Sequence, residues 1–235
     1  MRRIGRVVSL ARFPVKSMRA EPRQELELGW NGVLGDRQYA FVRQDATTGF
    51  PWLTGRELPA LVLHGAAYAE PEHPYTAEVR VTAPDGTATA LRDPALVARL
   101  SDAARHPAGL MRLNRGAYDS MPLSVISTRT LARLGEAHGA VLDAARFRSN
   151  IVVALDDDGP DELAWQGAVG FGATAVLRAD RPIPRCKMIT IDPHTAAIDR
   201  GVLRTVNHGF SNHAGLYATP VTLGRIAVGD AVCVN

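Results

Sequence analysis

The stretch VRVTAPDGTATAL, residues 79–91, sets the character of the fold. Pro84 presets φ and Gly86 accepts a positive φ, so a turn is predicted at Pro84-Asp85-Gly86. The flanking segments, Val79 to Ala83 and Thr87 to Leu91, then pair as the two strands of a hairpin. This stretch therefore predicts an antiparallel β unit.

Similar short strands recur on both sides of this hairpin, at intervals of roughly 8–12 residues. They are predicted at Ile4 to Leu10, Gln24 to Leu28, Tyr39 to Arg43, Leu61 to Tyr68, Ile151 to Leu155, Ala168 to Phe171, Thr174 to Leu177, and twice in the tail from Thr222 to Val234. Helical patterning is confined to Asp93 to Arg105, where Asp93 can act as N-cap, and Thr128 to Gly139. A mainly β chain with a few helices favours a barrel or a sandwich over a doubly wound α/β sheet.

The composition excludes several classes of function. The chain has 235 residues, 46% of them hydrophobic, and a net charge of +3. Its arginines are scattered, without a basic run interleaved with aromatics, so nucleic acid is not expected as a partner. The two cysteines are too few for a disulfide framework, and the N-terminus has no sustained apolar stretch. We therefore expect a cytoplasmic protein without a membrane anchor. GxGxxG, GxxxxGK[ST] and GxSxG motifs are absent from the sequence.

Cys186 is the strongest candidate for chemistry. It lies in PIPRCKMITIDP, where the prolines predict a constrained turn entering a strand. Its neighbours Arg185 and Lys187 favour the thiolate, the form that a nucleophile or a soft-metal ligand requires. The alternative is that Cys186 is a small buried hydrophobic residue. Cys233 alternates with valines in the terminal strand and is interpreted as core.

Candidate binding residues lie near the ends of predicted strands. Lys16 and Ser17, in FPVKSM, could grip a phosphate. Arg37, in GDRQY, and Arg56, in WLTGRELP, could hold an anion. Arg148 and Asn150, in RFRSNIVV, stand two apart on a predicted strand and so share a face; an asparagine amide suits a pterin edge. Taken singly, each of these residues could equally be solvated.

Together these segments resemble a known family. FPVKS resembles the YPVKS motif of proteins with an N-terminal MOSC-associated β-barrel domain and a MOSC domain, named for the C-terminal part of molybdenum cofactor sulfurases. GVLGDRQYAFV, WLTGRELPALVL, RFRSNIVV, RCKMITIDPHT, GLYATP and IAVGDAV resemble further motifs in the family's order. The coverage runs from about Gly5 to Val232, and the pattern is most similar to the amidoxime-reducing component and its bacterial relatives. The resemblance implies a MOSC-type β-barrel core (111–235) packed with a smaller β-barrel-like domain (1–110).

The resemblance also implies a cofactor and its ligands. Cys186 matches the position that ligates molybdenum in the molybdenum cofactor. Lys16, Ser17 and Arg37 match positions that grip the phosphate and pterin, and Arg56 lies in a further matching motif. The remaining edge of the cofactor would be lined by Arg148, Asn150, Arg185 and Tyr217, with Asp119, in YDSMP, near the pterin.

The sequence departs from the family pattern at several positions. Ser149 replaces a proline between Arg148 and Asn150, which is expected to loosen that strand entry. Pro184 and Lys187 are unusual neighbours of the Arg-Cys pair, and HGFSNHAGLYATP is short. Because this segment would form the rim over the metal, these departures are expected to affect the choice of small-molecule substrate.

Two kinds of function follow from the resemblance. The first is a molybdenum-dependent reductase of N-hydroxylated or related N–O compounds. Since the sequence has no nicotinamide, iron–sulfur or haem motif, its electrons would come from a separate donor protein. The second is a cofactor or sulfur carrier in which Cys186 bears a persulfide, with a specialised biosynthetic role as a further possibility. The absence of a pyridoxal-phosphate domain from the sequence argues against sulfur generation.

Overall fold

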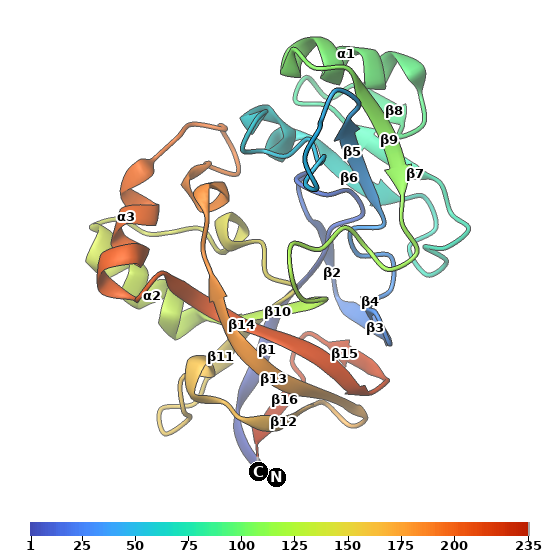
Figure 1. Ribbon diagram of the computed structural model, residues 1–235. Coiled ribbons are helices and arrows are strands. Elements are labelled where there is room, and N and C mark those ends of the chain that lie inside the picture. Colours follow the sequence, from blue (N-terminus) through green and yellow to red (C-terminus); the bar gives the residue numbers. More distant parts are fainter. Residues whose placement is uncertain (235) are drawn as a thin grey trace.

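Seven strands of the largest sheet within the described residues form a closed barrel (Figure 1). The computed structural model describes residues 1–234. Around the barrel the strand order is β11-β10-β14-β13-β12-β16-β1, and β1 pairs with β11 to close it. The strands are β1 (Arg2–Arg12), β10 (Leu123–Ser127), β11 (Ile151–Leu155), β12 (Gly167–Phe171), β13 (Ala175–Pro184), β14 (His213–Thr222) and β16 (Ala231–Val234).

Smaller sheets make up the N-terminal part of the chain. They are β5 (Tyr39–Arg43) with β9 (Ala108–Arg112), and β6 (Gly65–Tyr68) with β7 (Val79–Thr82) and β8 (Ala88–Ala90). The short strand β2 (Glu21–Arg23) extends the barrel sheet beside β1. A further sheet joins β15 (Arg225–Ala227), β3 (Glu25–Gly29) and β4 (Gly32–Val33), so it combines both ends of the chain.

Three separate apolar cores support these layers. One fills the barrel, and a second lies under α1 (Pro94–Ala104) in the N-terminal part. The third lies outside the barrel, where α2 (Thr128–His138) and α3 (Arg200–Gly209) bury apolar side chains against it. Four 3-10 helices connect the elements: η1 (Pro59–Leu63), η2 (Ala144–Phe147), η3 (Glu162–Ala164) and η4 (Lys187–Thr190). The predicted fold class, mainly β with a barrel core and a few helices, is confirmed.

Local sequence chemistry explains the elements that were predicted well. In the hairpin of β7 and β8, Asp85 accepts a hydrogen bond from the Thr87 amide, and Gly86 has a φ of 86°. Asp93 accepts a hydrogen bond from the Ala95 amide and so caps α1. Both features depend on residues close in sequence, which is why the pattern alone identifies them.

Two helical segments, η1 and α3, differ from the prediction. The segment Leu61 to Tyr68 is not one strand: η1 ends at Leu63, and only Gly65–Tyr68 forms β6. Pro59, at the start of η1, suits the first position of a helix, and Leu61 is fully buried. Helix α3 was not predicted. It is polar and contains few apolar residues, and it is stabilised by Val202 and Val206, which are buried in the third core.

The first strand of the chain belongs to the barrel built by the second half. β1 pairs antiparallel with β11 and with β16. At Gly5 the strands approach so closely that a Cβ would lie 2.3 Å from the Ala154 carbonyl oxygen. The division into domains 1–110 and 111–235 stays a prediction. β1 lies in the first of these ranges but pairs with β11 and β16 of the second. No helix within residues 1–234 is long and apolar enough to cross a membrane.

Candidate functional site

A cleft between the barrel and the N-terminal part contains every candidate residue. Its empty space, including the open mouth, is about 820 Å³. Its walls come from segments far apart in sequence, so only the fold brings them together. The sequence-predicted residues that line it are Lys16, Ser17, Arg37, Arg56, Asp119, Arg148, Asn150, Arg185, Cys186 and Tyr217.

Cys186 presents a free, exposed thiol to this cleft. It lies two residues after the end of β13 and is the N-cap residue of η4, where its carbonyl accepts a hydrogen bond from the Ile189 amide at 3.2 Å. The expectation that Cys186 lies on a turn entering a strand was wrong. The residue follows a strand and precedes a 3-10 helix. The alternative interpretation as a buried hydrophobic residue is excluded by its exposure.

The two cations beside Cys186 have different roles. Arg185 turns inward, donating from Nε to the Ala214 carbonyl at 2.7 Å and from Nη1 to the Phe147 carbonyl at 2.8 Å. Burial lowers the pKa of Arg185, because the charged form loses its hydration. Lys187 is exposed and donates to the Arg56 carbonyl at 3.1 Å. It therefore links η4 to the N-terminal part of the chain.

Lys16 and Asp119 form an ion pair in the cleft. Lys16 Nζ lies 2.5 Å from Asp119 Oδ1 and donates to the Ala117 carbonyl at 2.6 Å. Burial lowers the pKa of Lys16; Asp119 acts in the opposite sense, while Arg37 and Arg148 add to the lowering. Although burial acts to raise it, the pKa of Asp119 is lowered overall by Lys16 and the nearby arginines. Ser17 lies beside Lys16 and is buried.

Arg37 and Arg148 share the ring of Phe13. Their guanidinium carbons lie 4.4 and 4.5 Å from the ring centroid, and Arg37 also donates to the Arg148 carbonyl at 3.1 Å. Asp36, which is buried, forms an ion pair with Arg37 and accepts from the Phe13 amide. Burial lowers the pKa of Arg148, and the neighbouring Arg37 lowers it further. The Phe13 ring contacts both guanidinium groups, and Asp36 and the Arg148 carbonyl hold Arg37 in addition.

The prediction that Arg148 and Asn150 share a strand face was wrong. Arg148 caps the end of η2 with a φ of 54°, and β11 begins only at Ile151. The amide of Asn150 is already engaged: Oδ1 accepts from Ser124 at 3.1 Å and Nδ2 donates to the Ala11 carbonyl at 3.2 Å. Asn150 therefore shapes the cleft wall through these contacts.

Three residues of the cleft wall have a left-handed backbone. Ser17, Arg37 and Arg148 adopt φ values of 68°, 50° and 54°. This conformation costs free energy for residues with a Cβ and persists only where surrounding contacts enforce it. The contacts around these three residues therefore fix where their side chains enter the cleft.

The cleft has more buried cationic donors than acceptors. Within residues 1–234, Nη2 of Arg148 and Nη2 of Arg185 are buried without a hydrogen-bond partner. Asp119 is the one carboxylate in the described lining, which contains six cationic side chains: Lys16, Arg37, Arg56, Arg146, Arg148 and Arg185. Unpaired buried charges are costly, and an anion with several oxygens would satisfy them. A phosphate-bearing cofactor with a soft metal for the thiol fits this set of donors.

Pyrophosphate is a simple probe of this charge imbalance. We expect it to stabilise the wild type by about 2.7 kcal/mol at a hundredfold excess over its Kd, because it binds only the folded cleft. At the same concentration, Arg148→Met should lose most of this gain, whereas Arg204→Met, at an exposed position on α3, should keep it. Urea unfolding with potassium chloride at equal ionic strength as reference measures the effect. Equal stabilisation by the two salts would contradict it.

Four polar lining residues were missed as site residues from the sequence: Thr54, Tyr118, Ser124 and Arg146. Thr54, Tyr118 and Arg146 lie within motifs quoted above, WLTGRELP, YDSMP and RFRSNIVV, so a signal was present. Ser124 carries no comparable signal. The Tyr118 hydroxyl donates to the Asn31 carbonyl at 2.9 Å, and the Ser124 hydroxyl donates to Asn150 Oδ1.

Comparisons with known proteins agree with this architecture. A family model described as "MOSC domain" matches residues 112–233, and one described as "MOSC N-terminal beta barrel domain" matches residues 4–121. The YUAD protein from Bacillus subtilis has a similar structure, with a TM-score of 0.53, 14% identity, and coverage of 97% of this chain and 94% of its own. YiiM from Geobacillus stearothermophilus is less similar, with a TM-score of 0.38, 14% identity, and coverage of 48% and 54%. A search of curated proteins finds no match.

Proposed function

The chain belongs to the MOSC family, and on that premise we propose that it is a molybdenum-cofactor-dependent oxidoreductase acting on N-hydroxylated or related N–O compounds. The family as a whole is associated with the molybdenum cofactor. The proposal adds to this a particular cofactor site and a particular class of reaction.

One observation carries the proposal. The free thiol of Cys186 is exposed in the cleft whose lining also contains Arg148 and Arg185, each with a buried donor that has no partner within residues 1–234. A thiolate is a ligand for a soft, polarisable metal, and guanidinium groups bind phosphate oxygens. The two kinds of donor therefore suit the two ends of a phosphate-bearing dithiolene cofactor.

Different residues of this chain would bind different parts of the cofactor. Cys186 would provide the protein ligand, Arg148 and Arg185 would neutralise the anionic part, and Lys16 with Ser17 would hold the phosphate. When bound, the cofactor supplies two-electron redox chemistry. Reducing an N-hydroxylated compound breaks its N–O bond and consumes two electrons and two protons, giving an N–H group and water. The electrons would come from a separate donor protein, and we further propose that the protein works in the cytoplasm.

Elemental analysis and turnover test this function. The protein is produced in a host supplied with molybdate, and molybdenum per chain and reduction of benzamidoxime by a chemically reduced artificial donor are measured. We expect about one molybdenum atom per chain and measurable turnover. Bound molybdenum without turnover would overturn the reductase assignment. Metal-free protein with cyanide-releasable sulfur on Cys186 would overturn it in favour of a persulfide carrier.

A further inference from the structure

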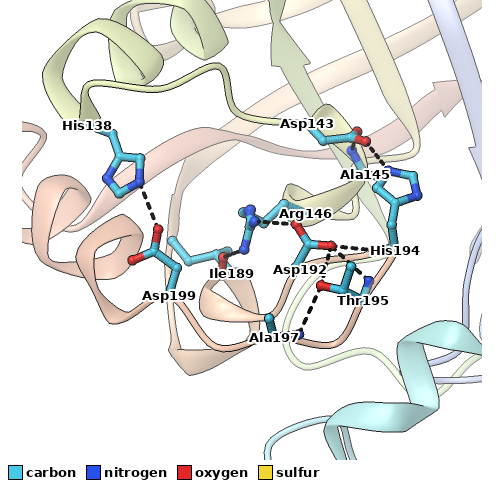
Figure 2. A network of polar contacts seen from close by, with 10 residues as sticks. All are labelled: His138, Asp143, Ala145, Arg146, Ile189, Asp192, His194, Thr195, Ala197 and Asp199. Atoms are coloured by element: carbon cyan, nitrogen blue, oxygen red, sulfur yellow. Dashed lines mark hydrogen bonds and ion pairs between the residues drawn. The ribbon is translucent and has the colours of Figure 1, made fainter.

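One buried side chain, Arg146, joins the two turns that carry Cys186 and Arg148. Its Nη1 donates to the Ile189 carbonyl at 3.2 Å, and its Nη2 donates to Asp192 Oδ2 at 3.0 Å (Figure 2). Arg146 itself lies in η2, so the contacts run from η2 to η4 and to the loop that follows it.

The acceptor of this contact is held firmly. Asp192 Oδ1 accepts from the His194 amide and the Thr195 amide, both at 2.9 Å, and from the Thr195 hydroxyl at 3.0 Å. These bonds, with the backbone amide of His194 foremost and Arg146 contributing, lower the pKa of Asp192. Its other oxygen faces Arg146, whose side chain is only 9% exposed. The ion pair is therefore fixed at both ends.

Arg146 is linked to both turns, by a hydrogen bond on one side and by the chain itself on the other. On one side, the Ile189 amide donates to the Cys186 carbonyl, while the carbonyl of the same residue accepts from Arg146. On the other side, Arg146 is two residues before Arg148, whose left-handed φ of 54° must be enforced by its surroundings. Moving the guanidinium of Arg146 would thus release the thiol and the arginine together.

A second link between the same segments is exposed. His194 Nε2 lies 2.6 Å from Asp143 Oδ2, and the two side chains are 67% and 42% exposed (Figure 2). Asp143 also caps η2 by accepting from the Ala145 amide. Because water and salt screen exposed pairs, this link is much weaker than the buried one. It provides a matched control within the same network.

We infer that Arg146 is a positioning residue that fixes Cys186 relative to Arg148, so that the thiol ligand and the anion donor are assembled before anything binds. Residues that support a metal ligand in this way commonly change affinity by about 10- to 100-fold when they are removed. The functional meaning of this positioning rests on the proposed molybdenum site. The positioning itself does not, because it is built from protein contacts alone.

Hydrogen exchange tests the positioning without any cofactor. In Arg146→Met, the backbone amides within residues 187–195, all except Pro193, should exchange about tenfold faster than in the wild type, because the carbonyl and carboxylate of this segment lose their contacts to Arg146. Amides of β13, residues 175–180, provide the reference within the same molecule. Asp192→Asn, which keeps the size of the side chain but removes the charged acceptor, should give the same pattern. In His194→Ala, the amides of the same segment should exchange at nearly the wild-type rate.

Each outcome bears on the inference. Faster exchange confined to 187–195 in both variants, with partial recovery in Arg146→Lys, supports it. Unchanged exchange in both variants, or equal acceleration in β13, would overturn it, since the latter indicates a general loss of stability. In molybdenum-loaded protein, retention should fall about 10-fold or more in Arg146→Met. Wild-type protein that never binds molybdenum would contradict the proposed function while leaving the exchange result intact.

Discussion

Replacing Cys186 by serine is expected to lower the reduction of N–O substrates by more than about 100-fold, because it removes the proposed ligand of the metal. A serine hydroxyl is a harder donor that keeps its proton at neutral pH, so it cannot replace a thiolate for a soft metal. The molybdenum content should fall in parallel. The melting temperature should hardly change, since the thiol is exposed. Elemental analysis, turnover and thermal unfolding measure these three effects.

The second cysteine provides the control for this experiment. Cys233 lies in β16, is only partly exposed and does not line the cleft. Cys233→Ser should therefore keep both molybdenum and activity, at a modest cost in stability. If Cys186→Ser kept wild-type molybdenum and turnover, the thiol could not be the ligand.

Removing Arg12 is expected to destabilise the fold by about 3–5 kcal/mol, because Glu21 then stays charged and buried with only the longer contact to Arg23, at 3.7 Å, as an ion pair. Arg12 donates to both carboxylate oxygens of Glu21 at 2.9 Å, and the side chains are only 5% and 8% exposed. It also donates to the carbonyls of Leu34 and Pro71, at 3.3 and 3.0 Å, which ties the end of β1 to the N-terminal part. The free energy of urea unfolding of Arg12→Met measures the loss.

Two further variants separate the cause from a general effect of losing an arginine. Adding Glu21→Leu to Arg12→Met should recover much of the stability, because the buried carboxylate that has lost its close partner is then gone. Arg2→Met removes an exposed pair with Asp158, whose side chains are 56% and 76% exposed, and should cost less than about 1 kcal/mol. Similar losses in Arg2→Met and Arg12→Met would be incompatible with this explanation.

The sequence by itself determined those elements whose signals are local. β5 and β11 have the predicted bounds, Tyr39–Arg43 and Ile151–Leu155, and the hairpin around Gly86 formed as its turn chemistry requires. The ordered series of motifs also identified the family and the residues that line the cleft. Such signals are readable because φ preferences, caps and alternating burial act over a few residues.

Only the tertiary structure decided how distant segments meet. β1 joins the barrel by pairing with β16, more than two hundred residues later in the chain, and closes it by pairing with β11; no local pattern specifies these partners. No local pattern specifies the conformation of Arg148 either, which lies in a strained turn and not in the expected strand. Nor does one specify the contacts of Arg146 to Ile189 and Asp192. These contacts depend on complementary charge and packing between segments that the chain brings together only on folding, so the site's geometry could not be read from the order of its residues.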